Sequence, residues 1–194
     1  MAAGVGLAVL LTHHRAASRA DQAYQGGPAG PSSAAAGSAS SSALPPRQQA
    51  AQALSGLLAQ SGTDRASVNQ AVSAVEDCSP GLIRDETIFG NAASSRTALL
   101  GKLAALPDGS ALPASMVPDL TTAWRASGQA DQDFAQWTHD EISHGCSTND
   151  KSDASYQATT IPDEQATKYK KAFAALWTTI ASQYSLPVYQ YDQI

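Results

Sequence analysis

The stretch RQQAAQALSGLLAQSGTDRASVNQAVSAVEDC, residues 47–78, decides the fold class because its apolar residues recur with a helical period. They share one face at heptad-like spacing: Leu54, Leu57, Leu58, Val68, Ala71, Val72 and Val75. The segment Ser61–Asp64 could end one helix and cap a second. Apolar positions on either side of it are nevertheless separated by multiples of seven, so the same face continues through it. We therefore expect one long helix with a weak point at Gly62.

Prolines divide the rest of the chain into three further helical stretches. They extend from Pro80 to Pro107, from Pro113 to about Ser143, and from Pro162-Asp163-Glu164 to Pro187. Proline followed by two acids suits a helix start, because the first N–H groups need no helical partner and acids favour the positive end of the helix dipole. Only Val188–Tyr191, in the tail, has a pattern that could form a strand. Four helices joined mostly by short turns predict an all-α, antiparallel up-down-up-down four-helix bundle.

The two cysteines support this topology. Cys78 ends the first helix and Cys146 follows the third, and helices one and three of such a bundle end on the same side. The thiols would then be neighbours in space although they lie far apart in the sequence. A disulfide between them would place the domain in an oxidising compartment, outside the cytoplasm. We predict this structural disulfide, with a pair of unrelated buried thiols as the alternative.

The chain before the bundle predicts a tether. Residues 1–15 open with the uncharged run MAAGVGLAVLLT, which is shorter than the about 20 apolar residues that span a bilayer. It also lacks the basic start and the cleavage site of a secretory signal. It therefore reads either as the end of an anchor helix that begins upstream or as a disordered start. Residues 16–46 are rich in Gly, Pro, Ser and Ala, which predicts a disordered linker before the bundle at 47–194.

Composition and motifs exclude several function classes. Only 15% of the 194 residues are charged, and the formal net charge is −5. No cluster of Lys and Arg marks a nucleic-acid footprint, so no nucleic-acid partner is expected. Gly-rich phosphate loops, His-Glu-x-x-His, Gly-x-Ser-x-Gly and paired Cys-x-x-Cys motifs are absent from the sequence. We expect no catalytic residue, no cofactor and no enzymatic activity.

The densest group of titratable residues is the segment Trp137–His144. Glu141 and His144 are three residues apart and therefore share a helix face. Glu-x-x-His is half of a ferritin-like di-iron motif, but the sequence holds no second copy, and the other two histidines lie in the N-terminal tail. A single zinc or copper site at His139, Glu141 and His144 stays open beside the simpler interpretation as a solvated last helical turn. That simpler interpretation is the one we favour.

Other polar and aromatic groups have similarly plain explanations. Turn chemistry explains the loop Ser147–Asp153 better than a calcium site does, and its hydrogen bonds are expected to organise the disulfide end. Helical spacing makes the three tryptophans core residues rather than the lining of a cleft. The acidic pairs Asp85-Glu86 and Asp131/Asp133 are expected on helix surfaces. The tail Leu186–Tyr191 is expected to pack back along the bundle, and the alternative is that its tyrosines present a binding surface.

Four segments carry a resemblance to a known group of proteins: SGTDRASVNQAVSAVEDC at 61–78, PASMVPDLTTAWRASGQADQDFAQ at 113–136, Gly145-Cys146-x-x-Asn149-Asp150, and Leu186-Pro187-x-Tyr189-Gln190. In these segments the chain resembles a set of uncharacterised actinobacterial, Streptomyces-like extracytoplasmic helical proteins with a two-cysteine C-terminal domain. The resemblance covers essentially everything after the linker. It implies a helical domain outside the cytoplasm, often preceded by a membrane segment, and it implies no activity.

These observations favour a membrane-tethered or secreted helical domain that acts as a non-enzymatic binding or envelope-associated module. The membrane would be one partner, through residues 1–15, and an unidentified protein or small molecule would be another. The alternative is an extracytoplasmic ligand or metal sensor that uses His139, Glu141 and His144.

Overall fold

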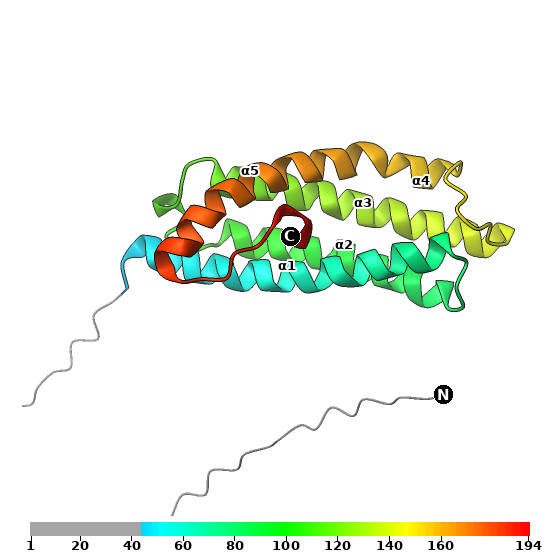
Figure 1. Ribbon diagram of the computed structural model, residues 1–194, viewed down its shortest axis with the longest axis horizontal. Coiled ribbons are helices and arrows are strands. Elements are labelled where there is room, and N and C mark those ends of the chain that lie inside the picture. The colour runs from blue at the N-terminus through cyan, green and yellow to red at the C-terminus, as the bar shows by residue number, and fades with distance from the viewer. Residues whose placement is uncertain (1–43) are drawn as a thin grey trace, which may run out of the picture. The chain divides into compact units, whose positions relative to one another are not determined.

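The computed structural model describes residues 44–194, and every regular element in this part of the chain is a helix (Figure 1). The long helices are α1 (Pro46–Glu76), α2 (Leu82–Ala104), α3 (Met116–His144) and α5 (Thr160–Tyr184). The short elements are the helix α4 (Ala154–Ala158) and the 3₁₀ helices η1 (Gly109–Ala111) and η2 (Tyr191–Gln193). The all-α prediction is confirmed. Residues 1–15, and all but the last three residues of the predicted linker, lie outside the described residues.

The four long helices pack side by side as a bundle (Figure 1). α2 has extensive contacts with both α1 and α3, and α3 also packs along α5. Contacts between α1 and α5 are much fewer, and the chain after α5 packs against α1 through η2. Within residues 44–194, no helix combines the length and the apolar character that are needed to cross a bilayer.

The ends of the helices follow from local chemistry. α1 passes through Gly62 without a break, which confirms the prediction of one long helix. Gly145 follows the last residue of α3 with a φ of 87°, a conformation that glycine adopts without the steric cost of a Cβ atom. α5 begins at Thr160, so Pro162 lies inside its first turn, where the N–H groups have no helical partners to lose.

Two local predictions were wrong. The chain from Ser147 to Pro162 was expected to be one loop, but it contains α4. The carboxylate of Asp153 caps α4 by accepting the backbone N–H groups of Ser155 and Tyr156, and this capping supports a short helix there. Val188–Tyr191 forms no strand, because the described residues contain no other strand to pair with it. Tyr189 packs against the core, whereas Val188 and Tyr191 are exposed.

The tail packs back along the bundle, as expected. The indole N–H of Trp177 donates a hydrogen bond of 3.0 Å to the carbonyl of Pro187. Leu186 and Tyr189 pack against the core, and Ile194 is fully buried. The ammonium group of Lys171 lies 4.7 Å from the centre of the Tyr191 ring. These contacts hold the segment after α5 against the helices.

The core is divided into two apolar clusters. The first lies toward the start of α1 and contains Leu54, Leu58, Leu99, Leu103, Met116, Leu120, Trp124, Phe173, Trp177 and Ile180, among others. The second lies toward the disulfide and contains Val68, Ala71, Val75, Phe89, Ala92, Ala130, Phe134 and Trp137. All three tryptophans are buried, which confirms their prediction as core residues.

Candidate functional site

The disulfide predicted from the sequence is present. Cys78 and Cys146 are bonded to each other, with their Cα atoms 5.6 Å apart and a sequence separation of 68. Because Cys78 follows α1 and Cys146 follows α3, these two helices end on the same side of the bundle. We call this side the disulfide end.

The loop after α3 organises the disulfide end, as the sequence predicted. The backbone N–H of Asn149 donates to the carbonyl of Glu76 at the end of α1, over 2.8 Å. The ammonium group of Lys151 lies 2.8 Å from the carboxylate of the same glutamate. The loop thus satisfies a carbonyl at the C-terminus of α1 and places a cation beside it, where the helix dipole favours positive charge.

The three candidate metal ligands of the sequence analysis do not form one group. His139 is exposed, and its Nδ1 atom lies 3.3 Å from a carboxylate oxygen of Glu86 on α2. Glu141 is buried, and its carboxylate accepts the backbone N–H of Ser147 at 3.0 Å. His144 is exposed at the end of α3. Ligand atoms that do come together belong to Cys78, Glu141 and Cys146, all within 4.8 Å of one another.

Charged side chains are buried at mid-bundle, between the two apolar clusters. We call the group Ser61, Arg96, Ser127, Asp131 and Lys170 the polar layer, and each of the long helices contributes to it. Arg96, Asp131 and Lys170 are only 1%, 3% and 4% exposed. The expectation that Asp131 lies on a helix surface was therefore wrong, and it was also wrong for Asp85, which is 1% exposed at the start of α2.

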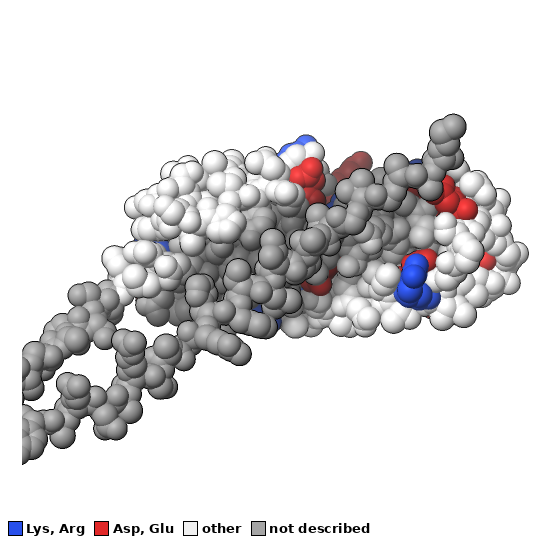
Figure 2. All heavy atoms as spheres, turned by 60° about the horizontal axis from the view of Figure 1, so that its bottom comes forward, with Lys and Arg blue, Asp and Glu red and all other residues white. Residues whose placement is uncertain are grey.

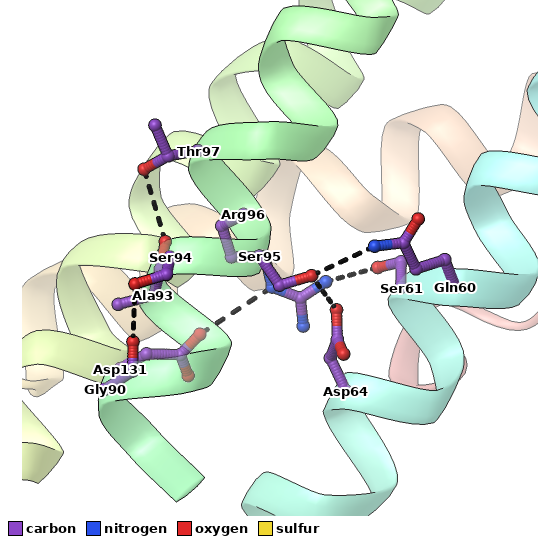
Figure 3. Close-up of polar contacts among 10 residues, drawn as sticks. All are labelled: Gln60, Ser61, Asp64, Gly90, Ala93, Ser94, Ser95, Arg96, Thr97 and Asp131. Atoms are coloured by element: carbon purple, nitrogen blue, oxygen red, sulfur yellow. Dashed lines mark hydrogen bonds and ion pairs between the residues drawn. The ribbon is translucent and has the colours of Figure 1, made fainter. Parts of the chain in front are cut away.

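Arg96 is the centre of the polar layer (Figure 3). From α2 its guanidinium donates a hydrogen bond to the hydroxyl of Ser61 on α1. Its Nε atom lies 3.7 Å from a carboxylate oxygen of Asp131 on α3, an ion-pair distance that is too long for a hydrogen bond. Gly128 makes room for this arrangement, since a Cβ atom there would lie 3.2 Å from the Cβ atom of Arg96.

A second set of contacts joins α1 to α2 beside Arg96 (Figure 3). The hydroxyl of Ser95 donates to the carboxylate of Asp64 over 2.6 Å and accepts from the amide of Gln60 over 3.2 Å. Lys102 extends this chain of contacts by donating to the amide oxygen of Gln60 at 3.0 Å. α1 and α2 are therefore held in one register by polar contacts as well as by apolar packing.

Burial dominates the electrostatics of the polar layer. It raises the pKa of Asp131 from 3.8 to about 6, and the nearby charge of Arg96 opposes only part of this rise. Burial, together with the smaller effect of the positive charges of Arg65 and Arg96, lowers the pKa of Lys170 from 10.5 to about 7. Burial lowers the pKa of Arg96 against the opposing effect of Asp131. The layer thus holds cations and a carboxylate away from water, where each charge costs free energy.

The described residues form several hollows that open to the surface. One of about 430 Å³ lies between α2 and α3 and includes Glu86, Gly90 and His139. Another of about 630 Å³ lies between α1 and the tail and includes Gly62, Arg65 and Tyr189. On the face that Figure 2 shows, the visible charged side chains are scattered among uncharged residues.

Sequence reasoning missed the polar layer, although a signal for it existed. Arg96 lies between Ala92 and Leu99, and Lys170 lies between Ala166 and Phe173, so both charges interrupt an apolar stripe at helical spacing. A charged residue within an apolar stripe predicts either that this helix face is open to water or that the charge is buried beside a polar partner. Only the positions of the neighbouring helices decide between these two outcomes.

No family model, curated protein or solved structure matches the chain. The polar layer is enclosed by the helices that form it, so it serves their packing. The disulfide end is partly exposed and combines sulfur and carboxylate groups, so it is the part of the described chain that is best suited to chemistry with an external reagent.

Proposed function

We propose that the domain is a disulfide-bonded helical bundle that acts outside the cytoplasm as a non-enzymatic binding or envelope-associated module. The observation that carries this proposal is the bond between Cys78 and Cys146. Disulfides persist in secreted and surface-exposed proteins, whereas the reducing cytoplasm keeps most thiols free. Residues 1–15 and the linker would make the domain a tethered one, or a secreted one if the first segment is removed.

The proposed topology is an antiparallel up-down-up-down four-helix bundle. The short connection from α1 to α2 and the common end of α1 and α3 support it. The resemblance to actinobacterial extracytoplasmic helical proteins supports the same cellular location. The enclosed polar layer supports a role in packing rather than catalysis, because a catalytic group has to reach a substrate.

Fractionation and protease treatment of intact cells test the proposed location. We expect the domain in the membrane or secreted fraction, digested by added protease while cytoplasmic markers stay intact. Peptide mapping without reductant, after thiols have been blocked in the living cells, should recover Cys78 and Cys146 in one linked pair. A protected domain with two free thiols would contradict the proposal.

A ligand or metal sensor is the second candidate function. The hollow of about 430 Å³ lined by Glu86 and His139 favours it, because the two side chains place a carboxylate and an imidazole at one surface opening. In this case zinc, copper or calcium should raise the melting temperature of the oxidised protein, and His139→Ala should abolish the increase. The absence of any shift with the three metals would remove the candidate.

A further inference from the structure

Glu141 is a buried carboxylate that lies beside the disulfide without a cation to balance it. It is 6% exposed, and among the described residues no ion pair includes it. Its one hydrogen bond in this part of the chain comes from the backbone N–H of Ser147 and engages a single carboxylate oxygen. Buried carboxylates usually have a charged partner or a bound metal, because burial of an unpaired charge is costly.

Two sulfur atoms that can bind a metal lie close to this carboxylate. The Sγ atoms of Cys78 and Cys146 and a carboxylate oxygen of Glu141 all lie within 4.8 Å of one another. Thiolate sulfur and carboxylate oxygen are both ligands of zinc, at about 2.3 Å and about 2.0–2.2 Å. Two sulfurs on a tetrahedral zinc ion lie roughly 3.8 Å apart at that bond length. The group is therefore already gathered to nearly the size of a zinc site.

We propose that reduction of the Cys78–Cys146 disulfide converts this end of the bundle into a zinc site, with Cys78, Cys146 and Glu141 as protein ligands. The fourth position of the tetrahedron would hold a water molecule, as in other zinc sites with three protein ligands. The metal would then link the ends of α1 and α3 in place of the covalent bond.

The chemistry balances with a small dithiol as the reductant. One of its thiolates attacks a cysteine sulfur and forms a mixed disulfide, and its second sulfur then displaces the cysteine. Two electrons and two protons reach the cysteines, and the reductant leaves as a cyclic disulfide. Zinc binding afterwards releases two thiol protons to solvent. The two thiolates and the carboxylate carry three negative charges against the two positive charges of zinc, so the site has a net charge of −1.

The surrounding structure prepares the site for this exchange. Cys78 and Cys146 are partly exposed, so a small reductant and a metal ion can reach them. The N–H of Ser147 orients Glu141, as hydrogen bonds commonly orient metal ligands from the outer shell. The contact from Asn149 to the end of α1 is made by backbone atoms and does not depend on the disulfide, so it can keep the ligands together after reduction.

Zinc titration of the full chain tests the proposal. The protein is reduced with a phosphine, freed of metal, and titrated with zinc in competition with a chromophoric chelator, while circular dichroism reports its helix content. We expect one zinc ion per reduced chain and none on the oxidised chain. Zinc should raise the melting temperature of the reduced protein only, and cobalt in its place should give the charge-transfer absorption of thiolate ligands.

Matched variants assign the ligands. Glu141→Gln in the reduced protein should weaken zinc binding roughly 10-fold or more, an effect at least as large as that of losing an outer-shell partner. Two control variants should leave the zinc affinity unchanged: Glu86→Gln and His139→Ala. Their side chains form the separate pair between α2 and α3. The double variant Cys78→Ser/Cys146→Ser should bind no zinc while it keeps its helix content.

Several results would overturn the inference. Zinc binding that survives in the double serine variant, or that disappears in His139→Ala but not in Glu141→Gln, would place the metal elsewhere. A reduced, helical protein that binds no zinc would also refute it, and so would a reduced protein that unfolds and is not restored by zinc. None of these results bears on the cellular location, which fractionation decides separately.

Discussion

At the scale of a single residue, Lys170 is a lysine that is buried inside the bundle. Its side chain is buried on α5, and no hydrogen bond or ion pair joins it to another described residue. Arg65 and Arg96 add positive charge nearby, and the carboxylates of Asp131 and Asp163 oppose them. The position is therefore one where the neutral amine suits the folded protein better than the ammonium ion does.

Replacing this lysine should remove a pH dependence of stability. The folded protein has a pKa of about 7 for Lys170 and the unfolded chain has 10.5, so the folded state binds fewer protons between these values. Its stability should therefore rise as the pH rises from 7 to 10.5. Urea denaturation of Lys170→Met should show higher stability than wild type at pH 7 and a flatter profile above it. The exposed neighbour Lys168→Met is the control and should keep the wild-type slope, and a persisting slope in Lys170→Met would contradict the assignment.

Unlike Lys170, Arg96 should contribute to the stability of the fold, because its guanidinium has partners on two other helices. Arg96→Met leaves Asp131 buried without its nearest cation and should cost about 3–5 kcal/mol of stability. The pKa of Asp131 should also move above its present value of about 6, since the charge of Arg96 lowers it. Denaturation curves and carboxyl-detected nuclear magnetic resonance measure the two effects. Arg125→Met, at an exposed position on α3, should change stability by less than about 0.5 kcal/mol.

At the scale of an element, the two glycines of α1 have different reasons to be there. The sequence predicted a weak point at Gly62, yet the helix is continuous there. The tail supplies the reason for glycine, because a Cβ atom at this position would lie 2.9 Å from the backbone oxygen of Gln193. Gly56, six residues earlier, would meet nothing within 4 Å. One glycine is thus required by tertiary contact and the other is not.

Two alanine substitutions should therefore change stability in opposite directions. Gly56→Ala should stabilise the protein by up to about 1 kcal/mol, which is the difference in helix propensity. Gly62→Ala should gain the same propensity but lose more, because the tail has to move away from α1. Thermal denaturation measures both, and hydrogen exchange in residues 186–194 should rise only in Gly62→Ala. Equal stabilisation by both substitutions would show that the tail does not pack at Gly62.

At the scale of the whole molecule, the disulfide limits the freedom of the unfolded chain. It closes a loop between residues separated by 68 positions and joins helices that have few direct contacts with each other. α1 and α3 are otherwise held together mainly through α2, which packs on both. Loss of the bond should therefore act on the stability of the bundle as a whole rather than on one contact.

The double variant Cys78→Ser/Cys146→Ser should be less stable by about 4 kcal/mol in metal-free buffer, from the entropy of a loop of this length. Its urea midpoint should fall while its helix content below the transition stays close to wild type. The wild-type protein reduced with a phosphine should behave in the same way. Midpoints that agree between oxidised and reduced protein would show that the bond contributes little.

The sequence by itself determined the helices, their approximate ends, the burial of the tryptophans and the pairing of the cysteines. These follow from local rules: the apolar period marks the buried face, proline and glycine mark the ends, and Cys78 and Cys146 follow helices expected to end together. The short helix α4 was missed because its capping aspartate, Asp153, lies in a segment with the composition of a turn.

Only the tertiary structure decided where the charges lie. Asp131 and Asp133 are two residues apart on α3 and look alike in sequence, yet one is buried beside Arg96 and the other bonds to Gln129 on the same exposed face. The same is true of Glu141, which faces the disulfide rather than the histidines of its own segment. A helix turns by about 100° per residue, so a small rotation of its packing moves a side chain between water and core. That rotation is set by contacts with other helices, which no single stretch of sequence contains.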